Sequence, residues 1–157
     1  MNPTKEQKTQ EVINAHRARV FHLMSKLSQE VMTRGNHHDL SKYEPEEFPL
    51  YAALIDEFET HFYGSEGYNK AKEAIKPATE HHFKYNRHHP EHFPNGIEGM
   101  NLVDLLEMLC DWKSATENHP QHPGDLNNSF AMAKKKYNIS PQLEQILYNT
   151  AKDFGML

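Results

Sequence analysis

The chain has 157 residues, enough for one domain with a sizeable core, and its 37% hydrophobic and 25% charged residues indicate a globular rather than a disordered protein. A net charge of −5 argues against general binding to duplex nucleic acid, although a nucleotide could still enter a local basic pocket. The single cysteine, Cys110, excludes an intrachain disulfide and a cysteine-rich zinc site. Because no apolar run could span a bilayer and the N-terminus is polar, we expect a cytoplasmic protein without membrane contact.

In the first part of the chain, apolar periodicity and capping residues predict helices. A first helix is predicted from Thr4, which begins a capping box, to Gly35, a common C-terminal stop. A short second helix is expected to carry residues 37–42. Pro45 is expected to open a third helix, since proline suits the first helical turn.

The rest of the chain also predicts helices and loops but no strands. One helical stretch is predicted over residues 68–89 with a kink at Pro77, followed by a loop over residues 90–99. Asn101 can cap a further helix that runs to about residue 116, and Ser140 can cap the last one. We therefore predict an all-α protein, a compact single-domain helical bundle that comprises residues 1–157.

The 12 histidines are the unusual feature of this composition. His38 and Asp39 are adjacent, and such a pair can ligate one or two divalent ions because a carboxylate can bridge two ions while an imidazole binds one. Adjacent His and Asp also occur by chance, so a metal site is predicted only if further candidate ligands accompany the pair. His16 lies on the apolar stripe of the first predicted helix, where a hydrogen-bonded core histidine is the alternative to a ligand.

Residues 81–89 contain four more histidines. His81 and His88 are seven residues apart, as are His82 and His89, so each pair would lie two turns apart on one helix face. Either pair can face inward, and periodicity does not choose between them. A solvated polar helix end is the alternative reading of this segment.

Acidic residues supply the remaining candidates. Asp104, Glu107 and Asp111 share one face of a predicted helix, which could also be its solvated side. Asp104 suits the N-terminal end of the helix dipole, whereas Asp111 lies mid-helix without such an explanation. Three further acids could supply a base or accept hydrogen bonds from ligands, or could simply form the acidic first turn of a helix: Glu44, Glu46 and Glu47.

The order of these residues resembles the HD-domain superfamily of metal-dependent phosphohydrolases. The closest sub-pattern is that of the HD-GYP cyclic-dinucleotide phosphodiesterases, in the sequence His16-Arg17-Ala18-Arg19-Val20, in Lys42 after the His-Asp pair, in His88-His89 before Gly96 and Gly99, and in Asp111-Trp112-Lys113-Ser114-Ala115. The GYP triplet itself is absent. The stretches HDLSKYEPEEF and HHFKYNRHHPEHF are more similar to small phage and bacterial HD-like proteins, over roughly residues 10–116.

This resemblance implies an HD-type bundle with a motif core at about residues 10–116 and C-terminal helices at 127–154. It implies one or two divalent ions, of Mn, Fe, Co, Ni or Zn, since mixed His/Asp ligation suits them all. The implied metal ligands are His16, His38, Asp39, His82, His88, His89 and Asp111. A bacterial or phage-infected cytoplasm and a homo-oligomer are both compatible with it.

The implied activity is hydrolysis of a phosphate ester, a nucleotide or a small phosphorylated metabolite. Asp39 and Lys42 are the expected catalytic residues: the carboxylate positions the attacking water, and the ammonium contacts the phosphate. Arg87 is a second candidate for phosphate contact. Two alternatives stay open, an HD-type diiron oxygenase and a non-catalytic nucleotide-binding factor. His119 and His122, in a proline-rich loop, are predicted not to be ligands.

Overall fold

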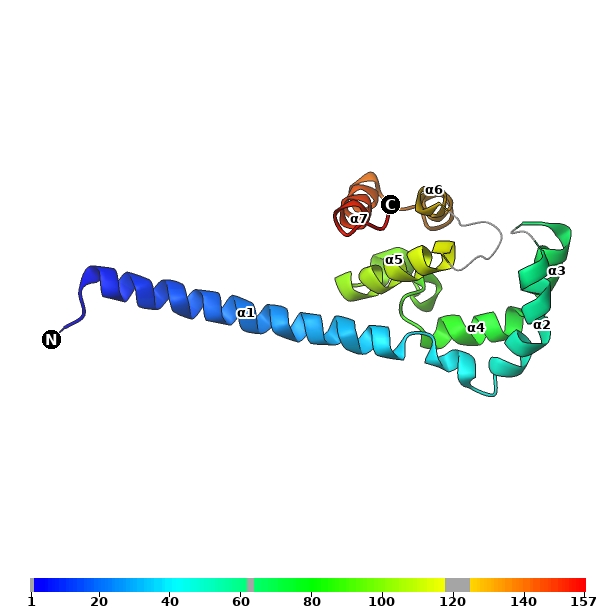
Figure 1. Cartoon of the computed structure of the whole chain (residues 1–157), viewed down its shortest axis with the longest axis horizontal. Helices are drawn as coiled ribbons and strands as arrows, with labels where there is room; N and C mark the ends of the chain where they lie inside the picture. The colour runs from blue at the N-terminus through cyan, green and yellow to red at the C-terminus, as the bar shows by residue number, and fades with distance from the viewer. Residues whose placement is uncertain (1, 62–63, 118–124) are drawn as a thin grey trace. The chain divides into compact units, whose positions relative to one another are not determined.

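The computed structural model describes residues 2–61, 64–117 and 125–157 (Figure 1). These residues form α-helices and short 3₁₀ helices but no strand, so the all-α prediction is confirmed. The α-helices are α1 (Lys5–His37), α2 (Phe48–Thr60), α3 (Glu66–Ala74), α4 (Lys76–Tyr85), α5 (Leu102–Glu117), α6 (Leu126–Tyr137) and α7 (Pro141–Asp153). The 3₁₀ helices are η1 (Leu40–Tyr43), η2 (Pro90–His92) and η3 (Gly96–Gly99). No helix in the described ranges is long and apolar enough to cross a membrane.

The chain divides into two compact units, residues 1–36 and 37–157. The first unit consists mainly of α1, which begins with the predicted capping box: the Thr4 amide donates to Gln7 Oε1 at 2.8 Å, and the Gln7 amide donates to Thr4 Oγ1 at 3.2 Å. The predicted stop at Gly35 is wrong. Gly35 is not among the residues with positive φ, so it does not form a left-handed cap, and the helix continues to His37.

In the second unit, the turn after α1 differs from the predicted short helix. Asp39 adopts a left-handed conformation, with φ 59° and ψ 13°, and only then does the 3₁₀ helix η1 follow. Aspartate tolerates this conformation better than most residues because its short polar side chain can hydrogen-bond locally. The next helix, α2, begins at Phe48 rather than Pro45, and Pro49 occupies its first turn.

The stretch predicted as one helix over residues 68–89 is two helices followed by a turn. The break comes at Ile75, and Pro77 lies in the first turn of α4, where its missing N–H costs no hydrogen bond. Helix α4 ends at Tyr85, and Asn86 is already extended, with φ −113° and ψ 112°. His88 and His89 therefore lie outside the helix, so helical spacing does not decide which way they point.

Helix α5 is shared between the hydrophobic core and the candidate site. Its start is the one predicted, since Asn101 Oδ1 accepts from the amides of Val103 and Asp104 at 2.9 and 3.0 Å. Ser140 likewise caps α7. One face of α5 contributes Met108 and Leu109 to a buried core shared with residues of α6 and α7, namely Leu126, Phe130, Leu147 and Ala151. The neighbouring face carries Asp104, Glu107 and Asp111.

Candidate metal centre

The candidate centre draws its side chains from four segments of the second unit. His38 and Asp39 come from the turn after α1, and His82 comes from the C-terminal part of α4. His88 and His89 come from the turn that follows α4, and Asp111 comes from α5. The fold thus brings together residues that are more than 70 positions apart in the sequence.

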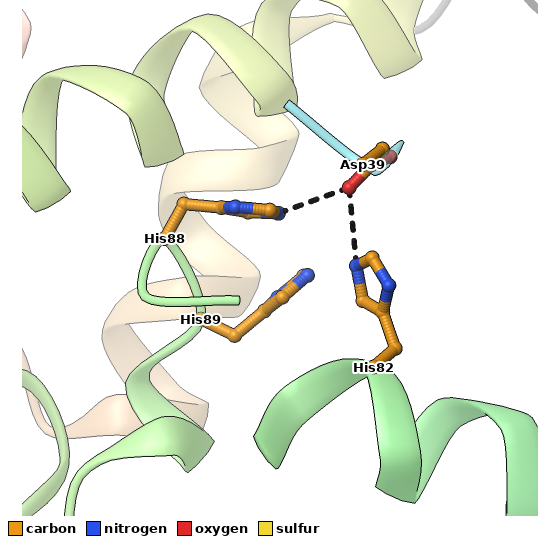
Figure 2. A group of neighbouring side chains, drawn as sticks. All are labelled: Asp39, His82, His88 and His89. Atoms are coloured by element: carbon orange, nitrogen blue, oxygen red, sulfur yellow. Dashed lines mark ion pairs between the residues drawn. The ribbon is translucent and has the colours of Figure 1, made fainter. Parts of the chain in front are cut away.

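Asp39 belongs to the first ligand group, in which it forms ion pairs with His88 and His82 (Figure 2). Its Oδ1 is 3.1 Å from His82 Nε2 and 3.4 Å from His88 Nε2. The ring of His89 is directed toward the same space. Asp39, His82, His88 and His89 each offer one ligand atom, and these atoms all lie within 4.8 Å of one another. That spacing is compatible with four ligands around one ion.

Two atoms of this group are buried without a hydrogen-bond partner among the described residues. They are Asp39 Oδ1 and His88 Nε2. The nitrogens of His82 and His88 approach Asp39 Oδ1 at 3.1 and 3.4 Å, but neither contact is a hydrogen bond. A buried polar atom left unsatisfied costs about 1–3 kcal/mol, so native proteins rarely leave two of them facing each other without a purpose.

The other oxygen of Asp39 belongs to a second ligand group. His38 Nε2 lies 3.5 Å from Asp39 Oδ2 and 3.6 Å from Asp111 Oδ1. His38, Asp39 and Asp111 again offer atoms within 4.8 Å of one another. Asp39 therefore faces one group with each of its two oxygens, which allows one or two ions.

Two glutamates contact the histidines from the opposite side of their rings. Glu107 Oε1 is 3.0 Å from His38 Nδ1 and 3.1 Å from His88 Nδ1. Glu47 Oε2 is 3.0 Å from His82 Nδ1, and the Glu47 side chain is 0% exposed. Each of these histidines thus has Nδ1 on a carboxylate while Nε2 faces the candidate centre.

Sequence reasoning placed Glu107 only on a shared helix face and Glu47 only in an acidic cluster. The sequence left open whether that helix face points into solvent, and the burial of its acids answers this. Asp104 is fully buried and the Glu107 side chain is 10% exposed, so the face is directed inward rather than into solvent. The available signal was the spacing, since Glu107 precedes Asp111 by one helical turn and must share its surroundings.

The charges of the centre shift several pKa values. Hydrogen bonds to Asp111 and Glu107 raise the pKa of His38 to about 10, against the opposing effect of burial. Burial, reinforced by the neighbouring His88 and His82, lowers the pKa of His89 to about 3. His89 therefore presents a neutral imidazole, the form that binds metal, near neutral pH.

The carboxyl groups of the centre are held in their charged form. Burial alone would raise the pKa of Asp39, but His82, His88 and Lys42 outweigh it and hold the pKa well below its usual range. Burial would also raise the pKa of Asp111, and the hydrogen bond from His38 overcomes it. Charged carboxylates and a neutral imidazole are the forms that a divalent cation requires.

The two predicted cationic phosphate contacts differ in position. Lys42 Nζ lies 2.5 Å from Asp39 Oδ2, directly beside the centre. Arg87 instead donates to both oxygens of Asp104, at 3.1 and 2.9 Å. Because Asp104 is fully buried, this two-point contact commits Arg87 to a structural role and does not leave it for phosphate.

Among the other histidines considered from the sequence, only His81 has a described position relative to this group. His81 faces Glu47 Oε1 at 2.8 Å and Glu44 Oε2 at 3.9 Å, on the outer side of Glu47. His16 belongs to α1 in the first unit, and its role as a ligand stays a prediction. His119 and His122 lie outside the described residues, so their predicted absence from the centre is untested.

Fold and site together define an all-α protein with a candidate His/carboxylate metal centre. A family model matches residues 5–153, and the chain therefore belongs to DUF5662, a family of unknown function. A search of curated proteins and a search of solved structures found no match. The comparisons therefore indicate no activity, and the residues of the centre are the only basis for proposing one.

Proposed function

We propose that this protein is a metal-dependent phosphohydrolase that acts on a phosphate ester, such as a nucleotide or a small phosphorylated metabolite. The observation that carries the proposal is the pair of buried, unpartnered atoms, Asp39 Oδ1 and His88 Nε2, which face each other at 3.4 Å. A divalent cation between them would satisfy both atoms at once. The surrounding imidazoles and carboxylates suit Mn, Fe, Co, Ni or Zn.

The residues that would hold one or two ions are those of the two ligand groups. One ion would be held by Asp39 Oδ1 together with His82, His88 and His89. A second would be held by Asp39 Oδ2 together with His38 and Asp111. When bound, such a cation supplies Lewis acidity to phosphate oxygens and lowers the pKa of water. This chemistry is the basis of phosphate-ester hydrolysis near neutral pH.

Lys42 supports a phosphate substrate rather than an uncharged one. Its side chain is 41% exposed, so a substrate can reach the ammonium from solvent. An ammonium has three donors, and Asp39 takes only one of them in this arrangement. Lys42 can therefore remain paired with Asp39 while it donates to a phosphate oxygen, and it would balance the charge that develops there.

The test begins with the full-length wild-type protein loaded separately with Mn²⁺, Fe²⁺, Co²⁺, Ni²⁺ and Zn²⁺. Elemental analysis counts bound ions, and a panel of nucleoside phosphates and small phosphate esters is assayed for release of phosphate or alcohol. Asp39→Asn keeps the shape of the side chain but removes its charge, and we expect it to lose both metal and activity. Lys42→Ala should keep its metal and lose about 10- to 1,000-fold in kcat/KM.

Lys70→Ala is the matched control, because Lys70 also pairs with a carboxylate within one helical turn but lies on α3, outside the centre. It should behave as wild type. A wild-type protein that binds none of these metals, or an Asp39→Asn variant that retains metal and activity, would refute the proposal. Nucleotide binding without turnover would favour a binding protein, and product formation that requires oxygen and iron would favour an oxygenase.

A further inference from the structure

The three acids on the inner face of α5 each contact residues of the candidate centre or of the segment that carries it. Asp104 holds Arg87, and Asp111 contacts His38. Glu107, between them, contacts two histidines from different segments. We propose that Glu107 is a positioning residue that fixes the ring orientation and the tautomer of both His38 and His88. This proposal rests on the proposed function, since it concerns the same metal centre.

A single oxygen of Glu107 contacts both histidines. Glu107 Oε1 lies 3.0 Å from His38 Nδ1 and 3.1 Å from His88 Nδ1, and the two ring centroids are 4.4 Å apart. A carboxylate oxygen only accepts hydrogen bonds, so both Nδ1 atoms must carry the hydrogen. Once a cation has displaced any second proton, each imidazole is neutral and has one N–H group, so each Nε2 then binds through its lone pair.

Both lone pairs are then available on the side of Asp39. His88 Nε2 faces Asp39 Oδ1 at 3.4 Å, and His38 Nε2 faces Asp39 Oδ2 at 3.5 Å. One glutamate thus prepares one histidine of each ligand group. The opposite tautomer would place an N–H on Nε2, and that nitrogen could no longer bind a cation.

A second glutamate contacts Nδ1 of the third histidine, which also lies 3.1 Å from both Ser41 Oγ and Asn86 Nδ2. Glu47 Oε2 is 3.0 Å from His82 Nδ1, while His82 Nε2 faces Asp39 Oδ1 at 3.1 Å. Histidines that ligate metals usually donate their other N–H to a carboxylate, carbonyl or water, and loss of that partner typically costs about 10- to 100-fold in metal affinity. Glu107 is distinguished from Glu47 because it serves two ligands.

The experiment compares full-length wild-type, Glu107→Ala and Glu107→Gln proteins with Zn²⁺ as the probe. Competition with a chelator gives the Zn²⁺ affinity. Long-range proton–nitrogen NMR on the Zn²⁺-loaded protein, labelled with ¹⁵N histidine, shows which ring nitrogen carries the hydrogen. In the wild type, both His38 and His88 should carry it on Nδ1.

Glu107→Ala should bind Zn²⁺ about 10- to 100-fold more weakly and lose the single tautomer at both histidines. Glu107→Gln retains an accepting oxygen, so it should keep the tautomers and fall between the other two in affinity, since a neutral amide accepts more weakly than a carboxylate. Glu117→Ala is the matched control: Glu117 ends the same helix, is 62% exposed and pairs with Lys113. It should leave affinity and tautomers unchanged.

Each outcome decides the proposal. A Glu107→Ala protein with wild-type affinity, or one that binds weakly while both histidines keep the Nδ1 hydrogen, overturns it. If circular dichroism shows that Glu107→Ala does not fold, Glu107→Gln carries the test, and wild-type affinity in that variant overturns the proposal. A wild-type protein that binds no Zn²⁺ overturns the proposed function and this proposal together, whereas wild-type binding with an unaffected variant overturns this proposal alone.

Discussion

Zn²⁺ binding near neutral pH should release about one to two protons per protein, because ligands must be deprotonated before they bind a cation. The pKa of His38 is raised to about 10 by its hydrogen bonds to Asp111 and Glu107, so this imidazole carries a proton on both nitrogens at pH 7. The pKa of His88 is also raised: burial lowers it, but contacts with Asp39 and Glu107 prevail. The Nε2 protons of these two histidines are the ones displaced.

The number of protons released follows from the pKa values of the histidines. With a pKa about three units above neutral pH, His38 is almost fully protonated and contributes close to one proton. His88 contributes up to one more. His89, with its pKa lowered to about 3, contributes none. The apparent Zn²⁺ affinity should accordingly rise about tenfold per pH unit for each displaced proton, as long as the pH stays below the pKa of His38.

Isothermal titration calorimetry in several buffers of different ionisation enthalpy measures this release directly. His38→Ala should reduce it by about one proton, and His89→Ala, which removes a ligand without a proton, should leave it unchanged. The two variants control for each other, because each lacks one imidazole of the centre. Wild-type binding without proton release, or a larger loss of release in His89→Ala than in His38→Ala, would refute the reasoning.

Two further predictions concern the metal-free protein. Its thermal midpoint, measured by circular dichroism with a chelator present, should fall as the pH rises from 6.5 toward about 10, because a raised folded-state pKa at His38 stabilises fully only below the unfolded value of 6.5; a flat profile would contradict this. Leu109→Ala should lower the free energy of unfolding in urea by about 2–5 kcal/mol, since Leu109 is fully buried in the core. Leu106→Ala, on the exposed side of the same helix, should change it far less, and equal losses would contradict the packing described.

Helix starts with a capping side chain could be predicted from the sequence, whereas the start expected at Pro45 was wrong. Thr4, Asn101 and Ser140 all cap helices as expected, because a cap is a hydrogen bond within three residues and needs no tertiary information. The end at Gly35 was wrong, since a glycine permits a left-handed cap but does not impose one. The end of α4 at Tyr85 and the turn after Asn86 depend on long-range packing, which apolar periodicity does not report.

In the candidate site, too, some features could be predicted from the sequence and others could not. The identities of the clustered residues His38, Asp39 and Asp111 came from their order along the chain and from the resemblance it carries. The choice of His82 over His81 could not be made, because it depends on how α4 is rotated against η1. The contacts made by Glu107 could not be predicted from the sequence either. The contact with His38 joins residues 69 positions apart, and the spacing of the acids on this helix fits a solvated face equally well.

Helix α5 makes the candidate metal centre dependent on residues that contribute nothing to it chemically. Its acidic face contacts the histidines, while the adjacent face, through Met108 and Leu109, is locked in place by α6 and α7. Repacking of that core could rotate the helix and carry Glu107 and Asp111 away from their partners. A mutational scan that scored only metal retention would therefore identify positions in the last two helices as readily as true ligands. Ligand assignment in this protein requires a spectroscopic readout of the coordinating atoms, because loss of binding alone does not separate a ligand from the scaffold behind it.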